Sequence, residues 1–279
     1  SSNNALQKAR WLLNAAKGGH TGTLDPMASG LLPLTLGEAT KFSQTLLDAD
    51  KAYDATVLLG VTTTTADAEG EVLARCPVDV SDSDIERALV QLRGDIEQVP
   101  PMYSALKHHG KALYEYARAG IEIPREPRHV RIHRFECLSR DGDSLMVRVE
   151  CSKGTYVRTL ASDLGAMLGC GAHLTALRRT RIGPFVIDGA VLLADIEAMP
   201  PEDRDSLLAP VDSLLVHLPR LDLDANQTRS FTHGQSAQGC IGAAGGVFRV
   251  YHDEGFLGVG NLDDAGALEP TRLISTSNQ

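Results

Sequence analysis

The residue types best suited to chemistry are concentrated in one short loop, GGHTGTLDPMASG, at residues 18–30. Asp25 precedes Pro26, which keeps the aspartate out of the α region and places it on a turn. The four glycines of the loop permit positive φ angles and a close approach of a ligand to the main chain. The apolar run LLPLTL follows directly and predicts a buried strand at residues 31–36. We therefore interpret the loop as an active site with a reactive carboxylate at Asp25. An Asx-turn, in which this carboxylate only bonds nearby amides, is the structural alternative.

This loop and several later motifs resemble the bacterial tRNA pseudouridine-55 synthases, a TruB-type pseudouridine synthase family. The pattern Gly-His-Thr-Gly-x-Leu-Asp-Pro-x-Ala-x-Gly is followed, in the family's order and close to its spacing, by GEATKF at 37–42, KAY at 51–53, DAEG at 67–70, VPPMYSALK at 99–107 and CSKGTYVRT at 151–159. The resemblance covers about residues 2–185. In the family a strand with a Lys-Pro-x-Gly turn precedes the position of Ser1, so we expect the sequence to open inside an element.

The resemblance implies three catalytic residues. Asp25 corresponds to the family's catalytic aspartate, and the sequence leaves open whether it attacks the uracil ring or the ribose C1′. Arg158 corresponds to an arginine that pairs with this carboxylate and keeps it ionised in a partly buried site, where a guanidinium can bind it through two hydrogen bonds. Tyr53 corresponds to an active-site tyrosine that stacks on the uracil or removes the C5 proton. An unactivated phenol is a poor base at neutral pH, so stacking is the safer role.

The resemblance also implies residues that bind the RNA. His20 corresponds to a histidine that fills the gap left by a flipped nucleotide, although it could instead bond the loop backbone. Leu177 corresponds to an apolar residue on the other side of the base, or it is a plain core leucine. Extruding a stacked base costs free energy, which contacts to the surrounding RNA must offset. Such contacts are expected from Lys41, Lys107, Lys111, Arg125, Arg128, Arg178 and Arg179.

The distribution of charge bears on an RNA substrate, because phosphate binding normally leaves a basic footprint and the net charge here is −9. Residues 107–134 nevertheless hold seven lysines and arginines against three acids. A second basic cluster, RRTR, occupies residues 178–181. We interpret residues 101–127 as a basic finger that projects from the body, is mobile in the free protein and closes on RNA. Ordinary solvated charge is the alternative for either cluster taken alone.

The elements that must position these residues indicate an α+β fold. We expect residues 1–210 to form a pseudouridine-synthase-like catalytic domain, with a mixed or antiparallel sheet, flanking helices and the RNA-binding insertion at about 101–127. Helices are expected at 4–16, 38–47, 81–92, 111–119 and 159–168, and strands at 31–36, 52–59, 72–75, 130–138, 144–151, 156–158 and 173–182. A short helix at 224–233 and strands at 247–252, 256–262 and 268–274 indicate a small C-terminal RNA-binding β domain, PUA-like, at 217–279.

Composition and motifs exclude several classes of protein. No run of eighteen apolar residues exists and no signal peptide opens the sequence, so we expect a cytoplasmic protein. Five cysteines without a C-x-x-C pair argue against a disulfide framework and a zinc site. The resemblance implies a monomeric tRNA pseudouridine(55) synthase that binds the T-arm stem-loop of tRNA and needs no cofactor, metal, membrane or obligatory protein partner. The rivals are a guide-RNA-dependent synthase and a tRNA-folding protein with dispensable catalysis.

Overall fold

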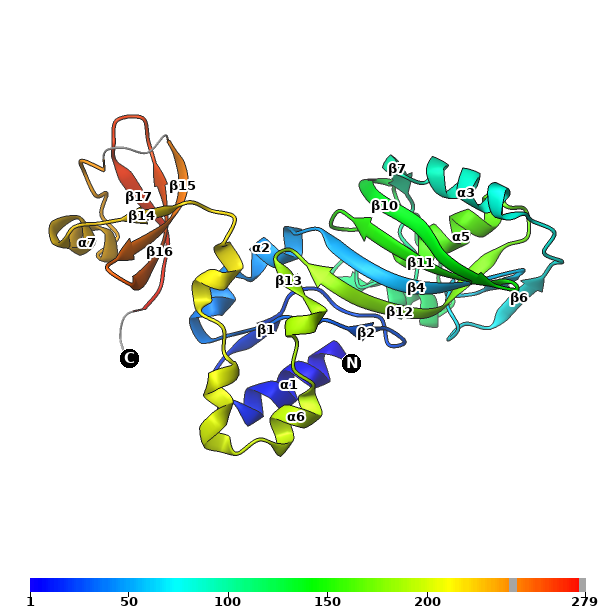
Figure 1. Ribbon diagram of the computed structural model, residues 1–279, viewed down its shortest axis with the longest axis horizontal. Coiled ribbons are helices and arrows are strands. Elements are labelled where there is room, and N and C mark those ends of the chain that lie inside the picture. The colour runs from blue at the N-terminus through cyan, green and yellow to red at the C-terminus, as the bar shows by residue number, and fades with distance from the viewer. Residues whose placement is uncertain (241–244, 276–279) are drawn as a thin grey trace. The chain divides into compact units, whose positions relative to one another are not determined.

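The computed structural model describes residues 1–240 and 245–275 (Figure 1). The chain forms two compact units, and each unit draws on separate stretches of sequence. The first contains Ser1 with residues 22–32 and 47–190, and the second contains residues 2–21, 33–46 and 191 onward. Residues 2–21 and 33–46 group with the C-terminal part, so the units are not consecutive segments of the chain. The domains expected at 1–210 and 217–279 stay a prediction.

A seven-stranded sheet is the scaffold of the first unit. Its strands follow the order β13–β12–β4–β11–β10–β7 and are antiparallel, while β2 pairs with β12 in parallel. Their bounds are Ser29–Gly30 for β2, Lys51–Leu59 for β4, Gly94–Gln98 for β7, Arg128–Asp141 for β10, Ser144–Cys151 for β11, Ala172–Ile182 for β12 and Phe185–Val186 for β13. The mixed sheet confirms the expected α+β class, and β10 and β11 form the expected hairpin.

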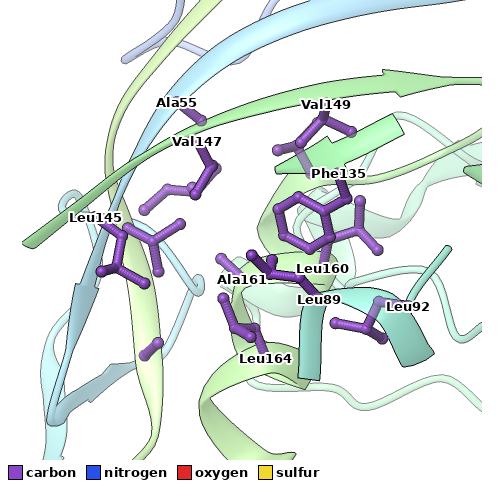
Figure 2. Packing of buried hydrophobic residues seen from close by; sticks show 14 of the residues in the cluster. Ala55, Leu89, Leu92, Phe135, Leu145, Val147, Val149, Leu160, Ala161 and Leu164 are labelled. Atoms are coloured by element: carbon purple, nitrogen blue, oxygen red, sulfur yellow. The ribbon is translucent and has the colours of Figure 1, made fainter. Parts of the chain in front are cut away.

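Helices α3 (Asp82–Gln91) and α5 (Val157–Met167) pack on one face of this sheet. Figure 2 shows Leu89 and Leu160 pointing toward strand residues such as Val147. Strand β11 supplies its buried residues in strict alternation, as expected for a strand with one covered face. Each fully buried leucine or valine contributes about 1.5–3 kcal/mol relative to an exposed one. The core thus makes the sheet a rigid support for the residues at its edge.

Short elements in both units differ from the sequence expectation in three places. The run at 31–36 is a strand only at β3 (Leu34–Leu36), since Pro33 cannot donate to a ladder. β3 pairs with β1 (Gly18–His20). A 3-10 helix, η1 (Gly37–Phe42), precedes α2 (Ser43–Asp48) where one helix was expected. Arg158 lies in the first turn of α5, and the strand expected at 156–158 is wrong.

The basic finger contains a two-residue hairpin, β8 (Lys107–His108) with β9 (Lys111–Ala112), followed by α4 (Leu113–Arg118). Leu113 is 4% exposed, so the finger has a buried aliphatic anchor that its charged composition conceals. The expected helix is shorter than predicted, and Gly120 follows it with a φ of +69°. Mobility of the finger stays a prediction. A further hairpin, β5 (Val61–Thr63) with β6 (Val72–Arg75), leads out of β4.

The second unit contains a four-stranded sheet in the order β14–β15–β16–β17. The bounds are Arg220–Asp222, Gly246–His252, Gly255–Leu262 and Leu268–Leu273, with α7 (Ala225–Thr232) packed beside them. Phe231 and Val250 are fully buried in its apolar cluster. The expected small C-terminal β domain is confirmed. This unit also contains η1, α1 (Ser2–Leu12), α6 (Leu193–Ala198), η3 (Pro201–Leu207) and η4 (Val211–Leu215), and η2 (Ile187–Gly189) lies near the end of the first unit. Within the described ranges, no helix is both long and apolar enough to cross a membrane.

Candidate active site

Asp25 and Arg158 form a bidentate ion pair, although they lie 133 positions apart in the sequence. Arg158 Nε donates to Asp25 Oδ2 at 2.7 Å, and Arg158 Nη2 donates to Asp25 Oδ1 at 3.0 Å. The arginine side chain is 4% exposed and the aspartate side chain 33% exposed. The carboxylate therefore faces solvent while the guanidinium supports it from the protein side. This geometry matches the pairing that the resemblance implies.

Three further groups hold the Arg158 guanidinium in place. Arg158 Nη2 also donates to the main-chain oxygen of Tyr103 at 2.8 Å, and Nη1 donates to that of Thr65 at 3.2 Å. The Asp67 carboxylate lies 3.6 Å from Arg158 Nε and is itself buried. Asp67 accepts hydrogen bonds from Thr65 Oγ1 and from the amide of Glu69, so its orientation is determined. The sequence assigns no role to Asp67, although the DAEG motif marks its position.

The loop that carries Asp25 is a turn pressed against the sheet. The amide of Ala28 donates to the main-chain oxygen of Asp25 at 2.9 Å, which closes a turn around Pro26. Directly after Ala28, β2 pairs with β12 through Ser29 and Gly30. Gly22 and Gly30 adopt φ angles of +101° and +97°, a region that residues with a side chain rarely occupy. Two of the four glycines predicted to shape the loop therefore do so, whereas Gly18 and Gly19 lie in the strand β1.

Tyr53 lies on β4 and is 8% exposed. Burial, reinforced by Cys151, raises the pKa of its phenol to about 12, against the opposing charge of Arg179. Tyr53 therefore carries a proton near neutral pH, as expected for an unactivated phenol. Leu177 lies on the neighbouring strand β12, where it pairs with Ala55 of β4. It belongs to the same apolar cluster as Tyr53. In a strictly alternating strand, Leu174 and Arg178 would lie on one face of the sheet and Leu177 on the other. An irregularity in the pairing of β12 with β4, between Leu174 and Ala176, shifts the register, so that Leu174 and Leu177 are both buried.

Arg179 does not have the role in RNA contact that we expected. It is 1% exposed, which leaves no surface for a phosphate. Its Nε donates to the main-chain oxygen of Leu31 at 2.8 Å, and its Nη2 donates to that of Gly22 at 3.1 Å. Its neighbour Arg178 is exposed, as an RNA contact requires. Charge and sequence position alone could not separate these two arginines.

Three family models match consecutive parts of the chain. TruB family pseudouridylate synthase (N terminal domain) matches residues 10–157, which is more than half of the sequence. The chain belongs to the TruB family. The tRNA pseudouridylate synthase B C-terminal domain matches residues 158–216, and Pseudouridine synthase II TruB, C-terminal, matches residues 219–274. The family expected from the motifs is thus confirmed.

Individual relatives agree with this assignment. The chain is 64% identical over 276 residues to the tRNA pseudouridine synthase B of Aromatoleum aromaticum, covering 99% of this chain and 89% of the relative. It is 56% identical over 284 residues to the protein of the same name from Chromobacterium violaceum, covering 100% and 92%. Among solved structures, Cbf5 in a Cbf5-Nop10-Gar1 complex is similar, with a TM-score of 0.73 and 26% identity over 98% of this chain and 80% of that chain.

Two residues that the TruB motifs connect with RNA lie in the second unit. His20 is half-buried on β1, and its Nδ1 atom has no hydrogen-bond partner among the described residues. This observation counts against the alternative in which that atom bonds the loop backbone. Lys41 Nζ donates to Glu38 Oε2 at 2.6 Å and to the main-chain oxygen of Leu273 at 2.8 Å. The Lys41 ammonium is therefore already engaged by protein groups, and a contact with RNA remains a hypothesis.

The finger of this TruB-family chain and the residue that directly follows it present several of the expected cations. Within the described part of the chain, Lys107 and Lys111 of the finger and Arg128 at the start of β10, together called the finger cations below, are exposed and form no ion pair. Lys111 lies over the ring of Tyr116, with Nζ 5.1 Å from the centroid. Arg125 is instead held by Glu122 and by the main-chain oxygen of Pro100. In the described ranges, no group of three or more His, Cys, Asp or Glu residues could hold a metal ion.

Proposed function

We propose that this protein isomerises uridine to pseudouridine in tRNA, at position 55 of the T-loop, with Asp25 as the nucleophile. The observation that carries this proposal is the bidentate Arg158–Asp25 pair in a chain of the TruB family. The relatives named tRNA pseudouridine synthase B support isomerisation and a tRNA substrate. Position 55 is the finer part of the proposal, and it is supported by the match of the motifs to the bacterial tRNA pseudouridine-55 synthases.

The pair of Asp25 and Arg158 suits the first step of this reaction. Isomerisation breaks the N-glycosidic bond, turns the uracil and rejoins it through C5, so it requires a nucleophile that stays ionised. Arg158 offsets the cost of partly burying the Asp25 carboxylate, and its fork leaves the outer side of that carboxylate open to a nucleotide. Attack on the uracil ring and attack on the ribose C1′ are both compatible with this arrangement.

Tyr53 and Leu177 supply the second part of the site. Both belong to the apolar cluster of the seven-stranded sheet, and apolar side chains are suited to holding an extruded base. Removal of the C5 proton then falls to a base near the reacting ring. Tyr53 can serve only if its phenol loses its proton during the reaction, because burial favours the neutral form in the free protein.

Binding of the RNA is assigned to the finger cations and to Arg178. Lys107, Lys111 and Arg128 are free of acidic partners within the described residues, so each can replace a condensed counterion on a phosphate. The long insertion favours recognition by the protein itself over dependence on a guide RNA. The presence of Asp25, Tyr53 and Arg158 favours an enzyme over a protein that only folds tRNA.

Release of tritium from [5-³H]uridine-labelled tRNA by the purified protein tests the proposal. We expect release from wild-type tRNA, and none from tRNA that carries cytidine at position 55. Release from the cytidine-55 tRNA would show that another uridine is the substrate. Release that requires an added guide RNA or partner protein would replace the proposal by its rival. Absence of release under every condition would refute the enzymatic function.

A further inference from the structure

We propose, on the basis of the function proposed above, that Arg179 is a buried positioning residue that fixes both ends of the Asp25 loop and holds them against Tyr53. Residues 22–31 turn at Asp25 and then pair with β12 through Ser29 and Gly30. Arg179 is the one residue of β12 that bonds the loop at its start and at its end, within the part of the chain that the structure describes.

The contacts of Arg179 close the loop through both its side chain and its backbone. The guanidinium donates to the oxygen of Gly22 at 3.1 Å and to that of Leu31 at 2.8 Å. The amide of Leu31 in turn donates to the main-chain oxygen of Arg179 at 2.8 Å. Since Arg179 is 1% exposed, water does not compete for these bonds. Hydrogen bonds from a charged donor to otherwise unpaired carbonyl groups are among the stronger ones in proteins.

Gly30 provides independent evidence that the loop is held tightly at this point. A Cβ atom at Gly30 would lie 2.3 Å from the main-chain oxygen of Arg179 and 2.8 Å from its nitrogen. Its φ of +97° is also unfavourable for any residue with a side chain. The backbone at Gly30 therefore lies so close to the Arg179 backbone that only glycine fits at this position.

Tyr53 connects the same guanidinium to the second half of the site. Arg179 and Tyr53 are direct cross-strand partners in the register of β12 and β4. Burial raises the pKa of the Tyr53 phenol to about 12, and the neighbouring charge of Arg179 opposes this rise. One residue thus bonds the loop of the nucleophile through its side chain and pairs with the tyrosine across the sheet, so it determines the spacing between them.

Replacement of Arg179 by lysine tests this role. Lysine keeps the charge, but its compact ammonium cannot reproduce the fork that spans the two carbonyls of Gly22 and Leu31. A misplacement of about 1 Å at reacting groups costs on the order of 100-fold in rate. We expect Arg179→Lys to lower kcat for tritium release by about 30- to 100-fold. Its Kd for a T-arm stem-loop should stay within about threefold, with an unchanged dependence on salt, because Arg179 faces no phosphate.

Two companion variants separate positioning from simple loss of stability. Gly30→Ala disturbs the same contact from the loop side, so it should lower kcat as well. The double variant with Arg179→Lys should show less than the product of the two single effects. Leu89→Ala, in the core of α3, should lower the melting temperature without changing kcat at a temperature where the protein is folded. Amide hydrogen exchange in residues 22–31 should accelerate in Arg179→Lys and Gly30→Ala, and it should be unaffected in Leu89→Ala.

The outcomes distinguish this inference from the proposed function. A kcat of Arg179→Lys within threefold of wild type, or unchanged exchange in the loop, would overturn the positioning role. A weaker Kd with a shallower salt dependence would restore the RNA-contact interpretation instead. If the wild-type protein releases no tritium, the proposed function fails, while hydrogen exchange still decides whether Arg179 holds the loop. Should Arg179→Lys not fold, Gly30→Ala with the same measurements decides the question.

Discussion

The replacement of Arg158 by lysine examines whether the fork geometry, and not charge alone, keeps Asp25 reactive. Arg158 donates two hydrogen bonds to Asp25 and one each to the main-chain oxygens of Tyr103 and Thr65. A lysine ammonium can retain about one bond to the carboxylate and cannot reach both carbonyls. A hydrogen bond to a charged group contributes about 1.5–3 kcal/mol, so the loss of one of the two bonds weakens support of the carboxylate by about 1.5–3 kcal/mol. At about 1.36 kcal/mol per tenfold, we expect kcat to fall by about 10- to 150-fold.

Arg148 offers a matched control, because it forms a second bidentate pair with Asp54. Its Nε and Nη2 lie 2.7 and 3.0 Å from the two carboxylate oxygens. These side chains are 38% and 30% exposed, unlike the buried Arg158. Exposed pairs of this kind contribute about 1 kcal/mol or less, so Arg148→Lys should leave the rate within about twofold.

The assay is single-turnover tritium release with enzyme in excess over labelled T-arm RNA, so that binding does not limit the rate. Circular dichroism confirms that each variant is folded at the assay temperature. A rate for Arg158→Lys close to that of Arg148→Lys would refute the bidentate reasoning. It would mean that any cation beside Asp25 suffices.

Four further predictions follow from the site and from the second unit. Asp25→Asn should abolish tritium release while RNA affinity changes by less than about tenfold, as filter binding can check, because the carboxylate attracts no phosphate. Tyr53→Phe keeps the ring and removes the hydroxyl. If the hydroxyl takes the C5 proton, the variant should form an RNA adduct, visible on a denaturing gel, without releasing product. Normal turnover of the variant would leave stacking as the role of Tyr53. Neutralising the three exposed finger cations should reduce the slope of log affinity against log salt by about two to three, whereas parallel lines would contradict phosphate contacts by Lys107, Lys111 and Arg128. A hydrogen bond from Lys41 lowers the pKa of Glu38 from 4.5 to about 2. The ionised Glu38 carboxylate therefore stabilises the fold above pH 4.5, and this stabilisation is lost as the pH falls toward 2. Glu38→Gln should lower the melting temperature at pH 7, and the melting temperature of the variant should fall less steeply in acid than that of the wild type.

The sequence correctly predicted the elements whose structure depends on residues close together in the chain. Helix α3 carries its own start signal, since the Ser81 hydroxyl accepts from the amide of Asp84 while the Asp84 carboxylate accepts from the amide of Ser81. The β10–β11 hairpin followed from alternation around a glycine turn. The Asp25–Arg158 pair was predicted from motifs, because neither residue's neighbours show that two residues 133 positions apart in the sequence come together.

The errors arise where distant residues override local preference. Tyr156 and Val157 favour a strand by residue type, yet Gln98 of β7 bonds both the amide and the carbonyl of Tyr156 and sets the start of α5 there. The sequence predicts that Arg179 is a surface cation. In the structure it is buried, and this burial depends on the short parallel pairing of β2 with β12. The compact units could not be read as consecutive segments, because residues 2–21 and 33–46 join the C-terminal part.

The bond from Arg158 to the main-chain oxygen of Tyr103 has a consequence for substrate selection. Tyr103 lies at the root of the finger, so one guanidinium contacts the nucleophile and the segment that is proposed to close on RNA. A shift of that root on binding changes the surroundings of the Asp25 carboxylate directly. RNAs that bind without closing the finger are then expected to have a lower kcat but the same Kd, as in induced fit. Fidelity of modification would therefore be visible as a spread of kcat among tRNAs that bind equally well.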